Sequence, residues 1–78
     1  MIKIYDNSNP PNIVGLLENA KDALECISDF LKSVNFKSYY IRINSIEDSK
    51  VIIDYGSHTH FFYLEDLEGG DIYKELVG

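Results

Sequence analysis

The side chains best suited to metal binding or acid–base chemistry are two histidines, His58 and His60. They are separated by one residue and follow Asp54 in the sequence. Histidines at alternate positions of a strand point to the same side, and together with a carboxylate they can ligate zinc or iron. A complete site needs further ligands, and the chain has no third histidine and only one cysteine. We therefore expect a hydrogen-bonding or pH-sensitive surface pair, with no bound metal and no other cofactor.

The sequence shows no catalytic pattern elsewhere. It has no glycine-rich phosphate-binding loop, no serine nucleophile motif and no histidine placed to activate Cys26. Cys26 falls at the edge of an apolar helix stripe, where a half-buried structural thiol is expected. We predict that the protein is not an enzyme.

Four acids at helical spacing form the first candidate binding surface: they are Glu18, Asp22, Glu25 and Asp29. On one helix they fall within a wedge of about 60° opposite the apolar side and extend over roughly 16 Å of the axis. Such a row could imitate the phosphates of a nucleic-acid strand. The other interpretation is the ordinary solvated face of an amphipathic helix, which Lys21 and Lys32 flank.

A second acidic cluster lies near the end of the chain and contains Glu65, Asp66, Glu68, Asp71 and Glu75, relieved only by Lys74. Acids at the start of a final helix complement its dipole, and the others favour solubility. The functional interpretation is a docking site for Arg and Lys side chains of another protein. On this interpretation the partner contacts Glu65, Asp66, Glu68 and Asp71 together with the four acids of the first surface.

The third surface is the side of the sheet that faces away from the helix. It would display Tyr40, Arg42, Ile52 and Asp54, with either Phe61 and Tyr63 or His60 and Phe62. Aromatic and Arg side chains anchor protein interfaces, and one helix leaves this side uncovered. We therefore count Tyr40, Arg42, Phe61 and Tyr63 among the predicted partner-binding residues, with a homodimer or a different protein as the occupant.

A strand, a loop and a long helix are predicted for the first half of the chain. Residues Ile2 to Tyr5 alternate as a β-strand does, and turn-forming residues 6–11 follow. Asn9 or Asn12 would cap the helix, which ends near Val34-Asn35 because Asn tolerates the left-handed conformation. The apolar stripe of this helix comprises Leu16, Ala20, Ala23, Leu24, Ile27, Phe30, Leu31 and Val34.

Three β-rich runs follow and predict a meander: residues 38–46, residues 51–55, and a third run that starts at His58 or Thr59 and ends at Leu64. In the first run Tyr39, Ile41 and Ile43 would form the apolar face. Turns are expected at 47–49 and at Gly56-Ser57, where Gly takes a positive φ angle. Asp71 would cap a short last helix.

The register of the last hairpin has two solutions. A two-residue loop puts His58, His60 and Phe62 on the same face as Val51, Ile53 and Tyr55, whereas a three-residue loop puts Thr59, Phe61 and Tyr63 there. We prefer the three-residue loop because it keeps both histidines out of the core.

Together these elements predict one α+β domain over residues 1–78, with the order β-α-β-β-β and a short C-terminal helix. A mostly antiparallel sheet would carry one long amphipathic helix on one face. A chain of 78 residues with 45% hydrophobic residues suffices for a single core. We expect no membrane association, because there is neither a signal peptide nor an apolar run of about 20 residues. A lone cysteine excludes an intrachain disulfide and favours the cytoplasm.

The net charge of −6 disfavours direct binding of nucleic acid, which needs clustered Lys and Arg, and favours a basic protein as partner. In size, in its two acidic surfaces and in its lack of catalytic motifs, the chain resembles the small acidic inhibitors encoded by phages and mobile elements, including anti-CRISPR proteins. More distantly it is similar to acidic antitoxin and immunity proteins.

The resemblance implies an inhibitor in the host cytoplasm that blocks the nucleic-acid-binding surface of a host defence or nucleic-acid enzyme. Its carboxylates would then be the contact groups. The alternative is an antitoxin-type or homodimeric interaction module that uses the aromatic sheet face.

Overall fold

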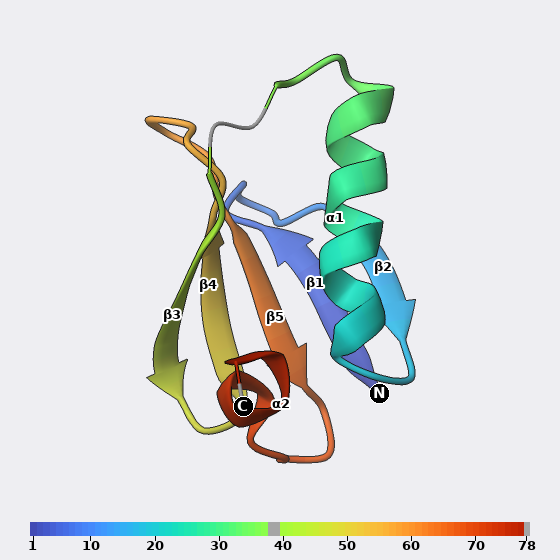
Figure 1. The fold of residues 1–78 in the computed structure, drawn as a ribbon, viewed down its shortest axis with the longest axis vertical. Helices are drawn as coiled ribbons and strands as arrows, with labels where there is room; N and C mark the ends of the chain where they lie inside the picture. Colours follow the sequence, from blue (N-terminus) through green and yellow to red (C-terminus); the bar gives the residue numbers. More distant parts are fainter. Residues whose placement is uncertain (38–39, 78) are drawn as a thin grey trace.

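The computed structural model of the protein describes residues 1–37 and 40–77. Within them the strands are β1 (Ile2–Asp6), β2 (Ile13–Leu17), β3 (Arg42–Glu47), β4 (Lys50–Asp54) and β5 (Phe62–Asp66), and the helices are α1 (Lys21–Ser33) and α2 (Ile72–Val77). The strands form one antiparallel sheet in the order β2-β1-β5-β4-β3. Both helices lie on the same side of this sheet (Figure 1). The predicted α+β class and short last helix are confirmed.

The main correction concerns residues 13–17, which form β2 and not the first turns of the helix. Ile13 and Leu16 are 60% and 53% exposed, and the strand pairs with β1 at the edge of the sheet. A β-branched start followed by Gly favours a strand over a helix. Gly15 also allows α1 to pack closely, since a Cβ at this position would lie 3.1 Å from Sγ of Cys26.

Helix α1 therefore begins at Lys21, much later than expected. The predicted caps, Asn9 and Asn12, are not at its start. Instead, the side-chain oxygen of Asn19 accepts a hydrogen bond from the backbone N–H of Asp22 (3.1 Å). Of the predicted apolar stripe, Ala20, Ala23, Ile27 and Leu31 are buried and Leu24 is partly buried, whereas Leu16, Phe30 and Val34 are exposed.

Three local predictions are confirmed. Helix α1 ends before Asn35, which adopts the left-handed conformation with φ of 58°. Gly56 has a φ of 99°, a value that other residues rarely adopt. Asp71 caps α2, because its Oδ1 accepts the N–H of Lys74 at 3.1 Å.

The preferred register of the last hairpin is wrong. Strand β4 pairs with β5 so that Val51 faces Leu64 and Ile53 faces Phe62, which turns Phe62 into the core. Phe62 and Leu64 are large apolar side chains, and their burial decides the register. The loop between β4 and β5 spans residues 55–61 and is longer than either predicted turn. His58 and His60 therefore lie in this loop, outside the sheet, and both are exposed.

Strand β3 also starts later than predicted, at Arg42. Ser38 and Tyr39, which were expected to begin it, lie outside the described residues. Ile43 is partly buried against the core as predicted, whereas Ile41 is exposed.

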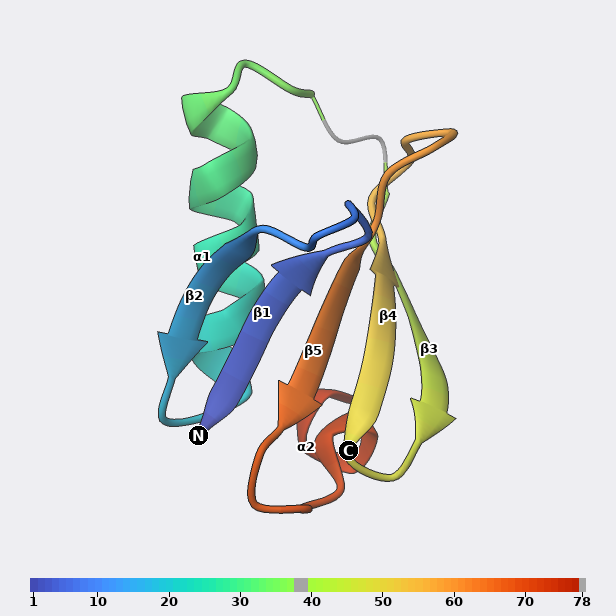
Figure 2. The ribbon, with the colours of Figure 1, turned by 180° about the vertical axis from the view of Figure 1, so that it is seen from behind.

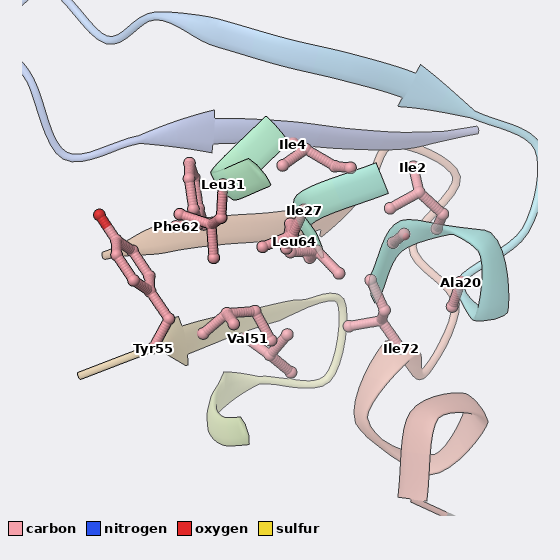
Figure 3. Packing of buried hydrophobic residues seen from close by; sticks show 12 residues of the cluster. Ile2, Ile4, Ala20, Ile27, Leu31, Val51, Tyr55, Phe62, Leu64 and Ile72 are labelled. Carbon is pink, nitrogen blue, oxygen red and sulfur yellow. The ribbon is translucent and has the colours of Figure 1, made fainter. Parts of the chain in front are cut away.

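The core lies between the sheet and the two helices (Figure 3). Its buried side chains are Ile2 and Ile4 of β1, Val51 and Ile53 of β4, Phe62 and Leu64 of β5, Ala23, Ile27 and Leu31 of α1 and Ile72 of α2, with Ala20 and Tyr55. Helix α1 contacts β2, and α2 contacts the strands at the other end of the sheet. The opposite side of the sheet carries no helix (Figure 2).

Two leucines test this assignment of inside and outside. Leu64→Ala should lower the free energy of unfolding by about 2–5 kcal/mol, because it leaves a cavity in the core. Leu16→Ala should change it by less than about 1 kcal/mol, because this side chain is already exposed. Urea denaturation measures both values. Equal losses would mean that residues 13–17 pack inside, as a helix beginning near Asn12 requires.

The loop between β1 and β2 is held by Asp6. Its Oδ1 accepts the backbone N–H groups of Ser8 (3.0 Å) and Asn12 (2.8 Å), and its Oδ2 accepts the side-chain N–H of Asn12 (3.0 Å). Partial burial alone would raise the pKa of Asp6, but the hydrogen bonds from Asn12 and Ser8 outweigh it and hold the pKa below its ordinary value.

A carboxyl group with a lowered pKa stabilises the folded protein above its unfolded pKa of about 3.9, and loses that contribution as the pH falls through the lower folded value. The stability difference between the wild type and Asp6→Ala should therefore be larger at pH 6 than at pH 3. Denaturation at both pH values measures it, with Asp29→Ala as the exposed control. A difference that does not change with pH would contradict this role of Asp6.

Candidate functional site

Three acids remain on the solvent side of α1: Asp22, Glu25 and Asp29, hereafter the acidic row. All three are exposed and lie within about 60° of one another, opposite the buried Ala23 and Ile27. They extend over roughly 10 Å of the helix axis. Glu18, the predicted fourth member, does not belong to the helix, because α1 begins three residues after it.

Glu18 instead meets the acids of the chain end. A pocket of about 470 Å³ opens between the start of the chain, the start of α1 and the segment after β5. Its charged lining consists of four acids, Glu18, Asp66, Glu68 and Glu75, and three bases, Lys21, Lys74 and the amino group of Met1; because the acids outnumber the bases, we call it the acidic pocket. The two acidic surfaces that the sequence separates thus meet where α1 begins.

Several tail acids also stabilise the fold. Asp66 accepts the N–H of Glu68 on Oδ1 (2.9 Å) and the N–H of Gly70 on Oδ2 (3.1 Å), so it fixes the turn after β5. A Cβ on Gly70 would collide with that second oxygen. Asp71 caps α2, as noted above. Asp66 and Asp71 therefore have a structural reason independent of any partner.

Few of the acids have a cation in contact. Among residues 1–37 and 40–77, the one ion pair within 4.0 Å joins the amino group of Met1 to Glu68 (3.0 Å). The hydrogen bond that this amino group donates to Glu68 raises the pKa of the amino group. Lys21 and Lys32, which flank the acidic row in sequence, make no such pair with it. The row is therefore available to external cations.

The uncovered side of the sheet, hereafter the outer sheet face, carries the side chains that alternate with the core. The charged ones are Lys3, Arg42, Glu47, Lys50, Asp54 and Glu65, and the larger uncharged ones are Tyr5, Ile13, Leu16, Ile52, Phe61 and Tyr63. Three bases balance three acids here. The entire net charge of −6 consequently lies on the rest of the chain.

Aromatic rings pack against one another at the centre of this face. Tyr5 and Tyr63 stack with ring centroids 5.2 Å apart, and Phe61 meets Tyr63 edge-on at 5.4 Å. Nζ of Lys50 lies 4.9 Å from the Tyr63 ring and 5.6 Å from the Tyr5 ring. Such contacts stabilise the packed arrangement of these side chains.

Polar contacts tie the same cluster together. The Tyr5 hydroxyl donates to Oε1 of Glu65 at 3.1 Å. A hydrogen bond with Tyr5 raises the pKa of Lys50, against a smaller opposing effect of burial. Near the sheet edge, the Arg42 guanidinium lies 4.8 Å from the ring of Tyr40, which is exposed.

The structure thus places Arg42, Phe61 and Tyr63 on the outer sheet face, and it moves Glu65 there from the predicted acidic cluster. Sequence reasoning missed Tyr5 and Lys50. Tyr5 could have been predicted from the sequence, because Ile2 and Ile4 alternate with Lys3 and Tyr5 along one strand. The contact between β1 and β5 had no local signal, because it joins the two ends of the chain.

The histidine pair does not form a site with Asp54. His58 and His60 are exposed, and Nδ1 of His60 lies 2.9 Å from the hydroxyl of Thr59. In the described part of the chain, no group of three or more His, Cys, Asp or Glu side chains is arranged to hold a metal ion. Cys26 is half-buried against the core. Neither of the helices described is long and apolar enough to cross a membrane.

Comparison with known proteins gives no relative: no family model matches the chain, and no curated protein or solved structure is significantly similar to it.

The Tyr5 hydroxyl gives a direct test of the polar cluster. Tyr5→Phe should cost about 1 kcal/mol of unfolding free energy, because it removes the hydrogen bond to Glu65. It should also lower the pKa of Lys50, which NMR titration of Nζ measures. Tyr63→Phe is the matched control and should affect both quantities less. Equal effects of the two variants would argue against the assigned hydrogen bonds.

Proposed function

We propose that the protein is a small inhibitor that binds the basic nucleic-acid-binding surface of a host defence or nucleic-acid enzyme, in the manner of anti-CRISPR proteins. The observation that carries the proposal is the distribution of charge. The net charge of −6 lies away from the outer sheet face. The acidic row and the acidic pocket concentrate much of it around the first turns of α1.

The spacing of the acidic row suits such a surface. Asp22, Glu25 and Asp29 follow one another at about 4.5 and 6 Å along the helix axis, which is about 1 and 3 Å more than the axial spacing of phosphates along one DNA strand. Arg and Lys side chains that line a nucleic-acid groove are long enough to reach such carboxylates. Charge of this density also steers a basic partner during association.

Binding alone accounts for inhibition in this proposal. A domain with Cα extents of 32 × 26 × 20 Å is wide enough to occupy a groove that holds a double helix, so steric exclusion adds to the electrostatic competition. The carboxylates serve this purpose through their negative charge alone. In this proposal the protein acts by binding and catalyses no reaction.

An antitoxin- or immunity-type module is the second candidate. The observation in its favour is the packed aromatic cluster of Tyr5, Phe61 and Tyr63, since interface hot spots are enriched in such residues. In that case a toxin would cover the outer sheet face, and the acids would serve solubility. The two candidates differ in which side of the molecule binds the partner.

Neutralising the acidic row separates the candidates. The variant Glu25→Gln/Asp29→Asn and the control Glu47→Gln/Asp48→Asn change the net charge equally, but only the first touches α1. Nucleic-acid-binding proteins captured by the wild type from a bacterial lysate should bind the first variant at least about tenfold more weakly, because each charge pair contributes about 1 kcal/mol. They should bind the control as the wild type, and more weakly at high salt.

The captured protein must also lose its nucleic acid when the wild type binds, which a fluorescence anisotropy competition measures. Equal affinity for both variants, or simultaneous binding of the inhibitor and nucleic acid, would contradict the proposal. Loss of binding only on Tyr63→Ala would favour the toxin-docking candidate.

A further inference from the structure

The outer sheet face is an uncovered surface of interface size. It lies on the broad side of the molecule, whose Cα extents are 32 × 26 Å (Figure 2). A standard interface needs about 800 Å² from each partner, which this side can provide. Its centre is aromatic and apolar, and its charges are balanced. A face with equal numbers of acids and bases suits a partner surface that also has no net charge.

Charges on this face have an ordered pattern. On β4, Lys50 and Asp54 stand two residues before and two residues after Ile52. On β3, Glu47 pairs with Lys50 and Arg42 pairs with Asp54. Each end of this strand pair therefore carries one base and one acid, and the order of the signs is reversed between the two ends.

Because the signs are reversed between the two ends, a suitable two-fold axis places each charge opposite a charge of the other sign in a second copy of the chain. If the axis lies in the plane of the face, across the strands and through the row of Tyr5, Tyr63 and Ile52, each strand meets its own copy in the opposite direction. Lys50 then meets Asp54 of the other copy, and Arg42 meets Glu47 of the other copy. The row on the axis packs against itself, so the aromatic residues form the centre.

The other face-to-face symmetry is disfavoured. An axis parallel to the strands and through β5 would exchange β1 with β4. Lys3 pairs with Glu65 and Glu65 with Lys50 across the strands, so this axis would bring Lys3 over Lys50 and Glu65 over itself. Like charges in direct opposition oppose association. The charge pattern thus selects one of the two arrangements.

Sheet twist leaves the favoured pairs within reach. Aligned sheets pack about 10 Å apart with their strands rotated by about 30°. Measured from Tyr63 at the centre of the face, Lys50 and Asp54 on β4 lie about 8 Å away and Arg42 and Glu47 on β3 about 12 Å away, so this rotation displaces them by about 4 Å and about 6 Å. The flexible side chains of Lys50 and Arg42 span such a displacement.

We propose that the outer sheet face binds a second copy of the chain, forming a two-fold dimer whose axis crosses the strands at Tyr5, Tyr63 and Ile52. Both helices of each copy then face outward, so the acidic rows remain exposed on opposite sides. The dimer does not rest on the proposed inhibitory function, since it requires no other protein.

A charge-reversal pair tests the dimer without a partner. Lys50→Glu places two acids in opposition in its own homodimer, and Asp54→Lys places two bases in opposition. Mixing the two variants restores attraction at both positions. Size-exclusion chromatography with light scattering, at about 100 µM protein, should give twice the 8.9 kDa chain mass for the wild type and one chain mass for each variant alone. The equimolar mixture should return to the dimer mass.

The reversals should weaken self-association at least about tenfold, which analytical ultracentrifugation over a concentration series measures. Circular dichroism confirms that each variant is folded. Because Lys50 also packs on Tyr63, the pair Arg42→Glu and Glu47→Arg on the exposed edge strand β3 provides the same test with less risk to folding.

A monomeric wild type at millimolar concentration would overturn the proposal. So would a mixture that stays monomeric, or single variants that dimerise like the wild type. Loss of binding to another protein on these reversals, in a wild type that is monomeric, would assign the face to that protein instead.

Discussion

Burial of the inward-facing side chains of β1, β4 and β5 beneath two helices is the interaction on which the rest of the structure depends. A strand alternates between two faces, so the residues that pack under α1 and α2 fix which residues face away. Ile4 inside places Tyr5 outside, and Leu64 inside places Tyr63 and Glu65 outside. Both the core and the outer sheet face follow from this one set of contacts.

The same constraint separates the charges. Positions outside the core on the helix side carry the acidic row and the acidic pocket, whereas the outer sheet face is balanced and aromatic. A molecule built in this way offers two chemically different surfaces. In the proposed inhibitor the acidic surface binds Arg and Lys of another protein, and in the proposed dimer the balanced surface binds its own copy. The proposed inhibitor and the proposed dimer use different sides and are compatible.

Much of the local structure was predictable from the sequence, because it depends on neighbouring residues. The αL position of Asn35, the positive φ of Gly56 and the cap from Asp71 required only local steric and hydrogen-bonding rules. Residues 13–17 were not predictable in this way. Their nearly continuous apolar run fits either a helix or a strand, and the packing of α1 against Gly15 decides between them.

The candidate surfaces were predictable in composition but not in assembly. Once the register of β5 is known, the alternation of a strand determines which side chains lie on the outer sheet face. The register itself depends on the burial of Phe62, which the preferred lengths of hairpin turns do not determine. The acidic pocket requires the first residue to meet the segment after β5, where the N–H of Leu67 donates to the carbonyl of Met1 (3.0 Å). Contacts between the chain ends have no local signature.

We propose that the surface of this fold that binds cations lies on the helix side. NMR titration of the labelled protein with a deca-arginine peptide tests it most directly, because amide chemical shifts report the binding site residue by residue. Salt-sensitive shifts are expected at the acidic row and around Glu18, Glu68 and Glu75, with none at Tyr5 or Tyr63. Shifts centred on the outer sheet face, with an unchanged α1, would contradict it.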